Sequence, residues 1–322
     1  MGKPDLLITR PMPDAVITAA GHICQVNVRP DNSRMTNAEL ANSLLEFDAV
    51  LSTFGDDYLG GVFPKTGKCR AGLIANFGVG FNHIDRAAAR GCGVVVTNTP
   101  GAVTEATADI AMSLILMAAR RIGEGERLLR AGCWQGWHPT QLMGMHLGGK
   151  TLGVIGMGRI GKAVARKAYF GFGMKVVFFN RSPVSEAGVP DAQQLDSIAK
   201  VMAASDVVSV SVPGGADNRH LISADVLQHA KPGSFLVNTA RGDVIDEAAL
   251  IDALRAGVLA GAGLDVYENE PLVPAALLAM ENVVLLPHMG TNALEVRTKV
   301  GLMAVENIRA FFAGEIPPNL VT

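Results

Sequence analysis

Three side chains that could together carry out acid–base chemistry each follow a strand-like apolar segment. They are Arg241, Glu270 and His288, and the segments before them are Ser234–Asn238, Leu259–Val266 and Val283–Leu286. In open α/β sheets, ligands bind beyond the carboxyl ends of the strands, so three strand ends can converge on one site. A fixed cation, a carboxylate and an imidazole can hold a substrate carboxylate and move a proton at the neighbouring carbon. Taken singly, each is better explained as an ordinary surface charge; together they indicate a site if the chain also binds a hydride carrier.

A glycine pattern predicts such a carrier. The segment Lys150–Ile155 is strand-like, and Gly156, Gly158 and Gly161 then open the helical stretch Lys162–Phe170. Between a strand and a helix, G-x-G-x-x-G permits a tight turn, close approach of the backbone to a diphosphate, and close packing of helix on strand. The diphosphate would rest against N–H groups at the positive end of the helix. The alternative is a purely structural turn, since glycine makes up 36 of the 322 residues.

The position expected to contact the adenosine ribose lacks an acidic residue. In NAD-binding domains, the strand after the glycine turn ends in a carboxylate that accepts a hydrogen bond from the ribose 2′-hydroxyl. Here the strand-like segment Lys175–Phe179 is followed by Asn180, Arg181 and Ser182. Without the carboxylate a 2′-phosphate is not repelled, and the Arg181 guanidinium matches a phosphate in geometry. We therefore predict NADP(H) as the preferred cofactor, with NAD(H) as the alternative; an ordinary polar turn before Pro183 would explain the same residues without a ligand.

The composition is typical of a two-domain chain without a nucleic-acid-binding or membrane-binding segment. Of 322 residues, 49% are hydrophobic and 18% charged, and the net charge of −2 comes without a basic run, so we expect no nucleic acid and no membrane as partner. The opening residues lack the apolar core of a signal peptide, and the longest apolar helix candidate, 110–119, is too short to span a bilayer. Four cysteines without a C-x-x-C pair are typical of reduced thiols, and no histidine has a second ligand at metal spacing. We expect a soluble, cytoplasmic protein with no metal site.

Alternating strand-like and helix-like segments predict parallel βαβ units along most of the chain. Strands are expected near residues 6–9, 24–28, 49–52, 73–76 and 94–97, and again near 151–156, 175–179, 207–212, 234–238, 260–265 and 283–286. An apolar helix is expected from Thr104 to Arg121, and a last helix from Asn292 to Phe312. We predict two doubly wound parallel-sheet α/β domains. A Rossmann cofactor domain (99–288) is inserted into a flavodoxin-like substrate domain (1–98 and 289–322), to which the last helix returns.

Two further segments could contribute to a site. In Asn76–Asp85, two glycines directly follow a strand, where exposed N–H groups could receive a carboxylate; a glycine-rich turn before a helix explains them equally well. Trp134 and Trp137 lie in a polar, glycine-broken segment with little apolar periodicity. We therefore expect the two indoles at an interface rather than in the core.

Taken in order, these segments resemble the D-isomer-specific 2-hydroxyacid dehydrogenase family, and most nearly its glyoxylate/hydroxypyruvate reductase branch. The resemblance extends over nearly the whole chain and is carried by residues 76–85, 98–107, 153–161, 237–243, 263–271 and 286–290. It implies NADPH-dependent reduction of a small 2-oxo acid, such as glyoxylate or hydroxypyruvate, to the D-2-hydroxy acid by a homodimer. A dinucleotide-sensing binding protein on the same fold is the alternative from another class. A 2-hydroxyacid dehydrogenase of different substrate range is the nearer alternative.

The same resemblance implies roles for individual residues. Arg241 corresponds to the group that binds the substrate carboxylate and carbonyl, His288 to the acid/base, and Glu270 to the partner of that histidine. The implied substrate-binding positions are Phe54, Val79, Gly80, Arg241 and, across a dimer, Trp137. The implied cofactor-binding positions are Thr104, Gly156, Gly158, Arg159, Ile160, Gly161, Asn180, Arg181, Ser182, Pro213, Asp265 and Gly290.

The chain departs from the family pattern at two places. A Pro-Leu-Thr-Pro-Glu-Thr-like run after the third strand of the cofactor domain is replaced by Pro213–Asn218, which could reshape one wall of the cofactor pocket. After His288 the chain reads Met-Gly-Thr-Asn, where a serine–alanine pair is more common. The second departure leaves the substrate range open.

Overall fold

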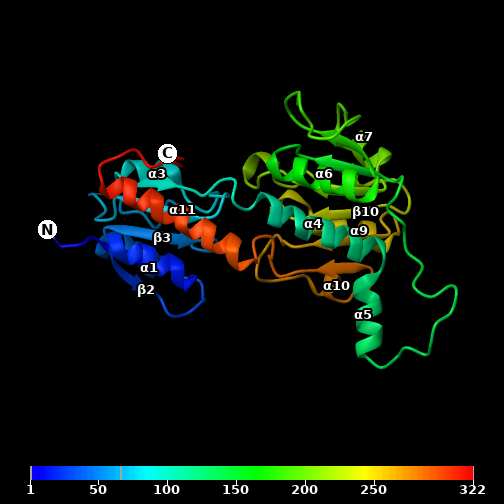
Figure 1. Cartoon of the computed structure of the whole chain (residues 1–322), viewed down its shortest axis with the longest axis horizontal. Helices are drawn as coiled ribbons and strands as arrows, with labels where there is room; N and C mark the ends of the chain where they lie inside the picture. Colours follow the sequence, from blue (N-terminus) through cyan, green and yellow to red (C-terminus); the bar gives the residue numbers. More distant parts are fainter. Residues whose placement is uncertain (1, 66, 322) are drawn as a thin grey trace. The chain divides into compact units, whose positions relative to one another are not determined.

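The computed structural model describes residues 2–65 and 67–321, which divide into two compact units (Figure 1). Unit 1 consists of Met1–Val103 and Thr291–Thr322, and unit 2 of Thr104–Gly290. The boundaries expected from the sequence, at 98/99 and 288/289, lie a few residues from these. Both units are α/β and each is built on one parallel sheet, so the predicted fold class is confirmed.

Unit 1 is built on a five-stranded parallel sheet with the order β2-β1-β3-β4-β5. This is the flavodoxin-like order. Its strands are β1 (Asp5–Ile8), β2 (Gln25–Val28), β3 (Ala49–Thr53), β4 (Leu73–Phe77) and β5 (Val95–Thr97). Its helices are α1 (Asp14–Ile23), α2 (Asn37–Glu46), α3 (Arg86–Gly91) and α11 (Leu294–Phe312).

Successive side chains of these strands alternate between two apolar layers, as the pleat of a strand requires. One layer contains Leu6, Leu51 and Leu73, and the other contains Leu7, Val50 and Ile74. Helices α1 and α11 cover the first layer and lie side by side in Figure 1, whereas α2 and α3 pack on the second. Unit 1 therefore contains helices from both ends of the chain.

Unit 2 is built on a seven-stranded parallel sheet with the order β12-β11-β10-β9-β6-β7-β8. The strand order reverses between β6 and β9, which is the doubly wound arrangement whose switch point binds a dinucleotide. The strands are β6 (Thr151–Ile155), β7 (Lys175–Phe179), β8 (Gln193–Gln194), β9 (Val207–Val210), β10 (Phe235–Asn238), β11 (Gly261–Leu264) and β12 (Val283–Leu285). The helices are α4 (Thr104–Ala119), α5 (Ile122–Arg130), α6 (Arg159–Phe172), α7 (Ile198–Ala204), α8 (Ala224–Leu227), α9 (Glu247–Arg255) and α10 (Ala275–Leu278), with short 3₁₀ turns η1 (Ala216–Asn218) and η2 (Gly242–Val244).

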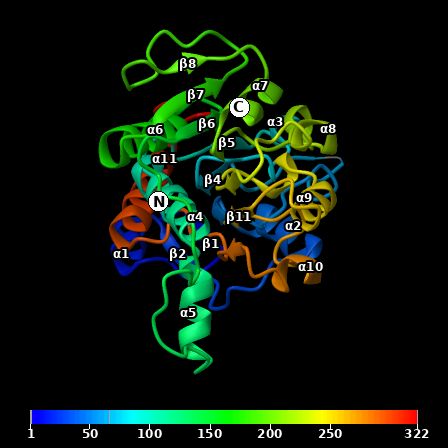
Figure 2. The same cartoon turned by 90° about the vertical axis from the view of Figure 1, so that its right-hand side faces the viewer.

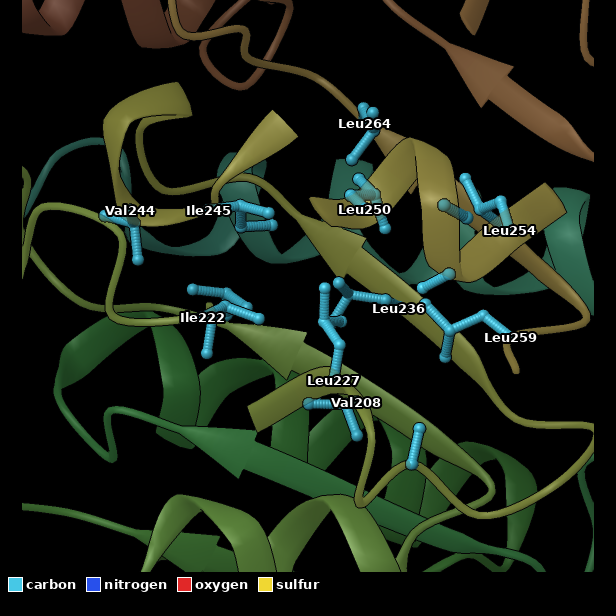
Figure 3. Packing of buried hydrophobic residues seen from close by; sticks show 14 of the residues in the cluster. Val208, Ile222, Leu227, Leu236, Val244, Ile245, Leu250, Leu254, Leu259 and Leu264 are labelled. Atoms are coloured by element: carbon cyan, nitrogen blue, oxygen red, sulfur yellow. The ribbon is translucent and has the colours of Figure 1, made fainter. Parts of the chain in front are cut away.

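Helices cover both faces of the sheet of unit 2, so its central strands are buried on both sides. Every residue of β9, β10 and β11 is buried, which explains why these strands are largely apolar in the sequence. Helices α4 and α6 pack on one face, and α7, α8 and α9 on the other. Figure 3 shows Leu227 of α8 and Leu250 of α9 packed near Val208 and Leu236 of the sheet.

The helix predicted from Thr104 to Arg121 is interrupted before its expected end. Helix α4 ends at Ala119, and α5 begins after Arg121, whose φ of 54° lies in the left-handed region. The Arg121 guanidinium donates two hydrogen bonds to Glu124, at 2.8 and 2.6 Å, in the first turn of α5. The chain changes direction here, and α5 extends away from the sheet of unit 2 (Figure 2). The last helix also begins later than predicted, at Leu294.

Within residues 2–65 and 67–321, no helix combines the length and the apolar character needed to cross a membrane.

Candidate functional site

The three candidate catalytic side chains lie beyond the ends of three neighbouring parallel strands of unit 2. Strand β10 pairs with β11, and β11 pairs with β12. Arg241 follows β10, Glu270 follows β11 and His288 follows β12. Because the strands are parallel and adjacent, all three residues leave the sheet at the same edge, which is the edge where ligands bind in such sheets.

Glu270 and His288 form a hydrogen-bonded pair. His288 Nδ1 lies 2.9 Å from Glu270 Oε2, and the Tyr267 N–H donates to Glu270 Oε1 at 3.1 Å. A carboxylate only accepts, so Nδ1 carries the proton of this bond and Nε2 is the ring nitrogen that can act on a substrate. Burial raises the pKa of the Glu270 carboxyl, but the hydrogen bond and charge of His288 and the Tyr267 N–H outweigh burial and hold this pKa below its ordinary value. Glu270 is therefore ionised at neutral pH.

The backbone at His288 is held in an unusual conformation by Asp265. The φ of His288 is 55°, in the left-handed region that costs a non-glycine residue about 1 to 2 kcal/mol. The Asp265 carboxylate accepts hydrogen bonds from Met289 N at 2.6 Å and from Gly290 N at 2.8 Å. Its carbonyl oxygen accepts from His288 N at 2.9 Å. Burial raises the pKa of Asp265, and the two N–H groups oppose that shift. Asp265 thus fixes the turn that presents the imidazole.

Arg241 is brought toward Glu270 by a close backbone contact. A Cβ atom at Gly242 would overlap the backbone of Tyr267 and the Glu268 nitrogen, so only glycine lets these two loops approach so closely. The Arg241 carbonyl accepts a hydrogen bond from Asn238 Nδ2 at 2.9 Å. Burial lowers the pKa of Arg241, and the carboxylates of Glu270 and Asp243 oppose this shift. A guanidinium remains charged in proteins, so the site holds one fixed cation.

The glycine turn has the shape that a dinucleotide requires. Gly156 has a φ of 97°, and a Cβ atom there would lie 2.6 Å from the Ser211 carbonyl oxygen at the end of β9. A Cβ atom at Gly161 would overlap the Gly156 carbonyl, which accounts for the close packing of α6 on β6. Gly158 is the N-cap of α6 and has no side-chain cap, and a Cβ atom there would meet open space. The first N–H groups of α6, at Arg159 and Ile160, are thus arranged as a diphosphate site needs.

The turn after β7 presents an exposed arginine. Asn180 Nδ2 donates to the Ser182 carbonyl oxygen at 3.0 Å, and Gln194 Nε2 donates to the carbonyl oxygens of Asn180 and Ser182, each at 3.1 Å. These bonds order the turn, while the Arg181 side chain is exposed. No carboxylate occupies residues 180–182, so the turn lacks the acid that accepts a hydrogen bond from the ribose 2′-hydroxyl in NAD-binding domains.

The candidate substrate-binding residues Phe54, Val79 and Gly80 belong to unit 1. They follow β3 and β4, which are neighbouring parallel strands. Asn76 Nδ2 donates to the carbonyl oxygens of Gly78 and Gly80, each at 3.0 Å, and Asn98 Nδ2 donates to the Val79 carbonyl oxygen at 2.9 Å. Side-chain amides therefore hold the carbonyl groups of this loop. Phe54 lies edge-on to the ring of His83, with ring centroids 5.9 Å apart.

The remaining candidates differ in their surroundings. Trp134 and Trp137 are 51% and 80% exposed in the segment after α5, so the prediction that they lie outside the core is confirmed. Thr104 is the first residue of α4, and Pro213 follows β9.

Asp243, two residues after Arg241, was not among the site residues predicted from the sequence. A carboxylate so close to the arginine in the chain was the only sequence signal that could have identified it. Within the described part of the chain, no cluster of three or more His, Cys, Asp or Glu side chains could hold a metal ion.

Comparison with known proteins identifies similar chains along the full length. A family model described as "D-isomer specific 2-hydroxyacid dehydrogenase, NAD binding domain" matches residues 112–290. A glyoxylate reductase of Korarchaeum cryptofilum is 39% identical over 99% of this chain and 96% of its own. A glyoxylate reductase of Thermococcus litoralis is also 39% identical, over 99% of this chain and 97% of its own. The solved NADPH-dependent glyoxylate/hydroxypyruvate reductase of Sinorhizobium meliloti, in complex with NADP and malonate, is 32% identical with a TM-score of 0.84, and the match covers 100% of this chain and 97% of that one.

Proposed function

The chain belongs to the D-isomer specific 2-hydroxyacid dehydrogenase family, and on that basis we propose that it reduces a small 2-oxo acid, glyoxylate or hydroxypyruvate, to the D-2-hydroxy acid with NADPH. Membership makes the protein an NAD(P)-dependent oxidoreductase. The observation that carries the proposed chemistry is the 2.9 Å pair of Glu270 and His288, at the same sheet edge as Arg241.

In the proposed reaction, Arg241 binds the substrate carboxylate and polarises the adjacent carbonyl. The dinucleotide, when bound, supplies the hydride. As the carbonyl carbon receives it, negative charge grows on the carbonyl oxygen, and a preorganised cation stabilises that charge. His288 then donates its Nε2 proton to this oxygen, and Glu270 stabilises the charged imidazolium that holds the proton beforehand.

The remaining substrate contacts are proposed from the family resemblance. Val79 and Gly80 would bind the carboxylate through backbone N–H groups, and Phe54 would form an apolar wall. Trp137 would line the pocket of a partner subunit in a homodimer, which is supported by its high exposure on a monomer. Each of these roles can be tested by a substitution that alters the substrate KM.

For the cofactor, we propose that the first turn of α6 holds the diphosphate and that Asn180, Arg181 and Ser182 surround the 2′-phosphate. Support comes from the uncapped helix start at Gly158 and from the exposed Arg181. The nicotinamide end is assigned to Asp265 and Gly290, with Thr104 and Pro213 as further contacts. A relative solved with NADP supports the preference for the phosphorylated cofactor.

The test is a panel of 2-oxo acids, including glyoxylate and hydroxypyruvate, assayed with NADPH and with NADH. We expect sustained NADPH consumption that falls to a low but measurable rate with Arg241→Ala and that is lost with His288→Asn. The matched control is His229→Asn, because His229 is an exposed histidine outside the proposed site. Binding of NADPH without turnover of any 2-oxo acid would favour a dinucleotide-sensing protein and overturn the proposal.

A further inference from the structure

The loop Pro213–Asn218, where the sequence departs from the family pattern, lies directly against Arg241. A Cβ atom built on Gly214 would be 2.8 Å from Cγ and 2.9 Å from Cβ of Arg241, and 2.7 Å from Asp243 Oδ1. All three distances are below those that real Cβ atoms make. Glycine at position 214 therefore lets the loop pack on the aliphatic part of the arginine, and any larger residue would displace the loop, the arginine or the aspartate.

Asp243 connects this loop to the turn that carries Arg241. Its Oδ2 atom accepts a hydrogen bond from Gly215 N at 2.9 Å, and its carbonyl oxygen accepts from His220 N at 2.8 Å. The loop is closed on itself because Asn218 Nδ2 donates to the Pro213 carbonyl oxygen at 2.9 Å. Asp243 thus accepts one hydrogen bond from within the loop, at Gly215, and one from just after it, at His220.

The second carboxylate oxygen of Asp243 is placed beside the arginine rather than in solvent. Within the described residues, Asp243 Oδ1 is buried and accepts no hydrogen bond. A buried oxygen that accepts no hydrogen bond destabilises the folded protein unless a nearby charge stabilises it. The neighbouring Arg241 supplies that charge, and the Asp243 carboxylate in turn opposes the lowering of the Arg241 pKa by burial.

From these contacts we propose that Asp243 is a positioning residue for Arg241. Its carboxylate holds the Gly214 segment against the arginine side chain, so that the guanidinium keeps one orientation toward the substrate carboxylate. The proposal rests on the role of Arg241 in the proposed function. It adds a contact that orients Arg241 and that depends on the combination of Gly214 and Asp243 in this chain.

The test compares kcat/KM for glyoxylate among four variants. Asp243→Ala removes the acceptor for Gly215 N and should lower kcat/KM about tenfold, the value of one charge-assisted hydrogen bond. Gly214→Ala should lower it at least as much, because its methyl group displaces Arg241. Asp243→Asn keeps an acceptor and should stay within about threefold of wild type. The matched control is Asp217→Asn, an exposed charge in the same loop, which should match wild type.

A double-mutant cycle shows whether the effect acts through Arg241. In an Arg241→Ala background, Asp243→Ala should have little further effect on kcat/KM, because the group that it positions is gone. A readout without turnover is the rate at which phenylglyoxal modifies Arg241 in the cofactor-free protein, followed by mass spectrometry. Asp243→Ala and Gly214→Ala should both raise that rate, and Asp217→Asn should not.

Three results would overturn the inference: wild-type kcat/KM in Asp243→Ala, an equal loss in the Arg241→Ala background, or an Asp243→Asn enzyme as impaired as Asp243→Ala. These results are distinct from failure of the proposed function. If Arg241→Ala itself retained full activity, the role of the arginine would be wrong. If Arg241→Ala were strongly impaired while Asp243→Ala behaved as wild type, only the positioning role of Asp243 would be wrong.

Discussion

Alanine substitutions in the glycine turn of unit 2 should separate its role in folding from its role in cofactor binding. In Gly156→Ala, the new Cβ would lie 2.6 Å from the Ser211 oxygen, whereas ordinary contact begins at 3.4 Å, so the turn must move by about the 0.8 Å difference. The alanine must also adopt a φ near 97°, which costs about 1 to 2 kcal/mol. With about 1 to 3 kcal/mol for overpacking, we expect a loss of about 2 to 5 kcal/mol in the stability of unit 2. This corresponds to a fall in Tm on the order of 10 °C.

Gly158→Ala should behave in the opposite way. Its Cβ meets open space and its φ is −82°, so the Tm should not fall. In the proposed cofactor site, the added methyl group lies where the diphosphate would approach the backbone. Loss of two N–H bonds to a charged oxygen, at about 1.5 kcal/mol each, would weaken NADPH binding about 100-fold.

The assay is the Kd for NADPH from fluorescence titration, measured beside thermal unfolding. Gly171→Ala is the control, because a Cβ atom there also meets open space but lies in the last turn of α6, away from the glycine turn. We expect wild-type NADPH affinity and a Tm no lower than wild type for this variant. A Gly158→Ala protein that binds NADPH as tightly as wild type would refute the reasoning and leave the glycine motif a purely structural turn.

Three further predictions concern the cofactor, the pH dependence and the assembly. Arg181→Ala should raise the KM for NADPH about tenfold or more while changing that for NADH less than about twofold, and equal use of both cofactors by wild type would contradict the assignment. Glu270→Gln should lower kcat for reduction about tenfold or more while changing the substrate KM much less, because the His288 ring loses the carboxylate that accepts its Nδ1–H bond; an unchanged kcat in a chemistry-limited assay would refute the pairing. The fold lowers the pKa of the Glu270 carboxyl, so the ionised carboxylate stabilises the folded protein fully above the ordinary pKa of 4.5. This stabilisation is lost as the pH falls through the lower pKa of the folded state. Glu270→Gln should therefore make thermal unfolding less sensitive to acid. Sedimentation should reveal a dimer at micromolar concentration, with Trp137→Ala about tenfold less active toward the 2-oxo acid; a fully active monomer would contradict this.

The sequence predicts the sheet edge of the candidate site because the signals for it are local. Strands of a parallel sheet are buried on both faces, so each is a continuous apolar run, and a polar residue just beyond such a run marks its carboxyl end. Arg241 and His288, each three residues beyond the end of its strand, could be identified in this way, whereas Glu270 lies six residues beyond the end of β11. Parallel pairing of neighbouring strands then places all three at one edge without knowledge of any tertiary contact.

Other features depend on contacts between segments distant in the chain and leave no local signal. The overlap that a Cβ at Gly242 would have with Tyr267 cannot be inferred from either segment alone. The two hydrogen bonds from the turn after His288 to Asp265 also join different strand ends. The left-handed conformation of Arg121 was missed for a different reason, because favourable helix formers precede it; its two hydrogen bonds to Glu124 are local contacts.

The return of α11 to unit 1 imposes an order on folding during synthesis. Residues Thr104 to Gly290, 187 in number, must leave the ribosome before α11 follows them. At about 5 to 20 residues per second this takes about 10 to 40 s, during which the sheet face formed by Leu6, Leu51 and Leu73 lacks half of its helical cover. Unit 2 is contiguous and can begin to fold as its strands emerge in that interval. Until α11 follows, the nascent chain therefore carries an incomplete unit 1 with an exposed apolar face, which is the kind of surface that chaperones bind.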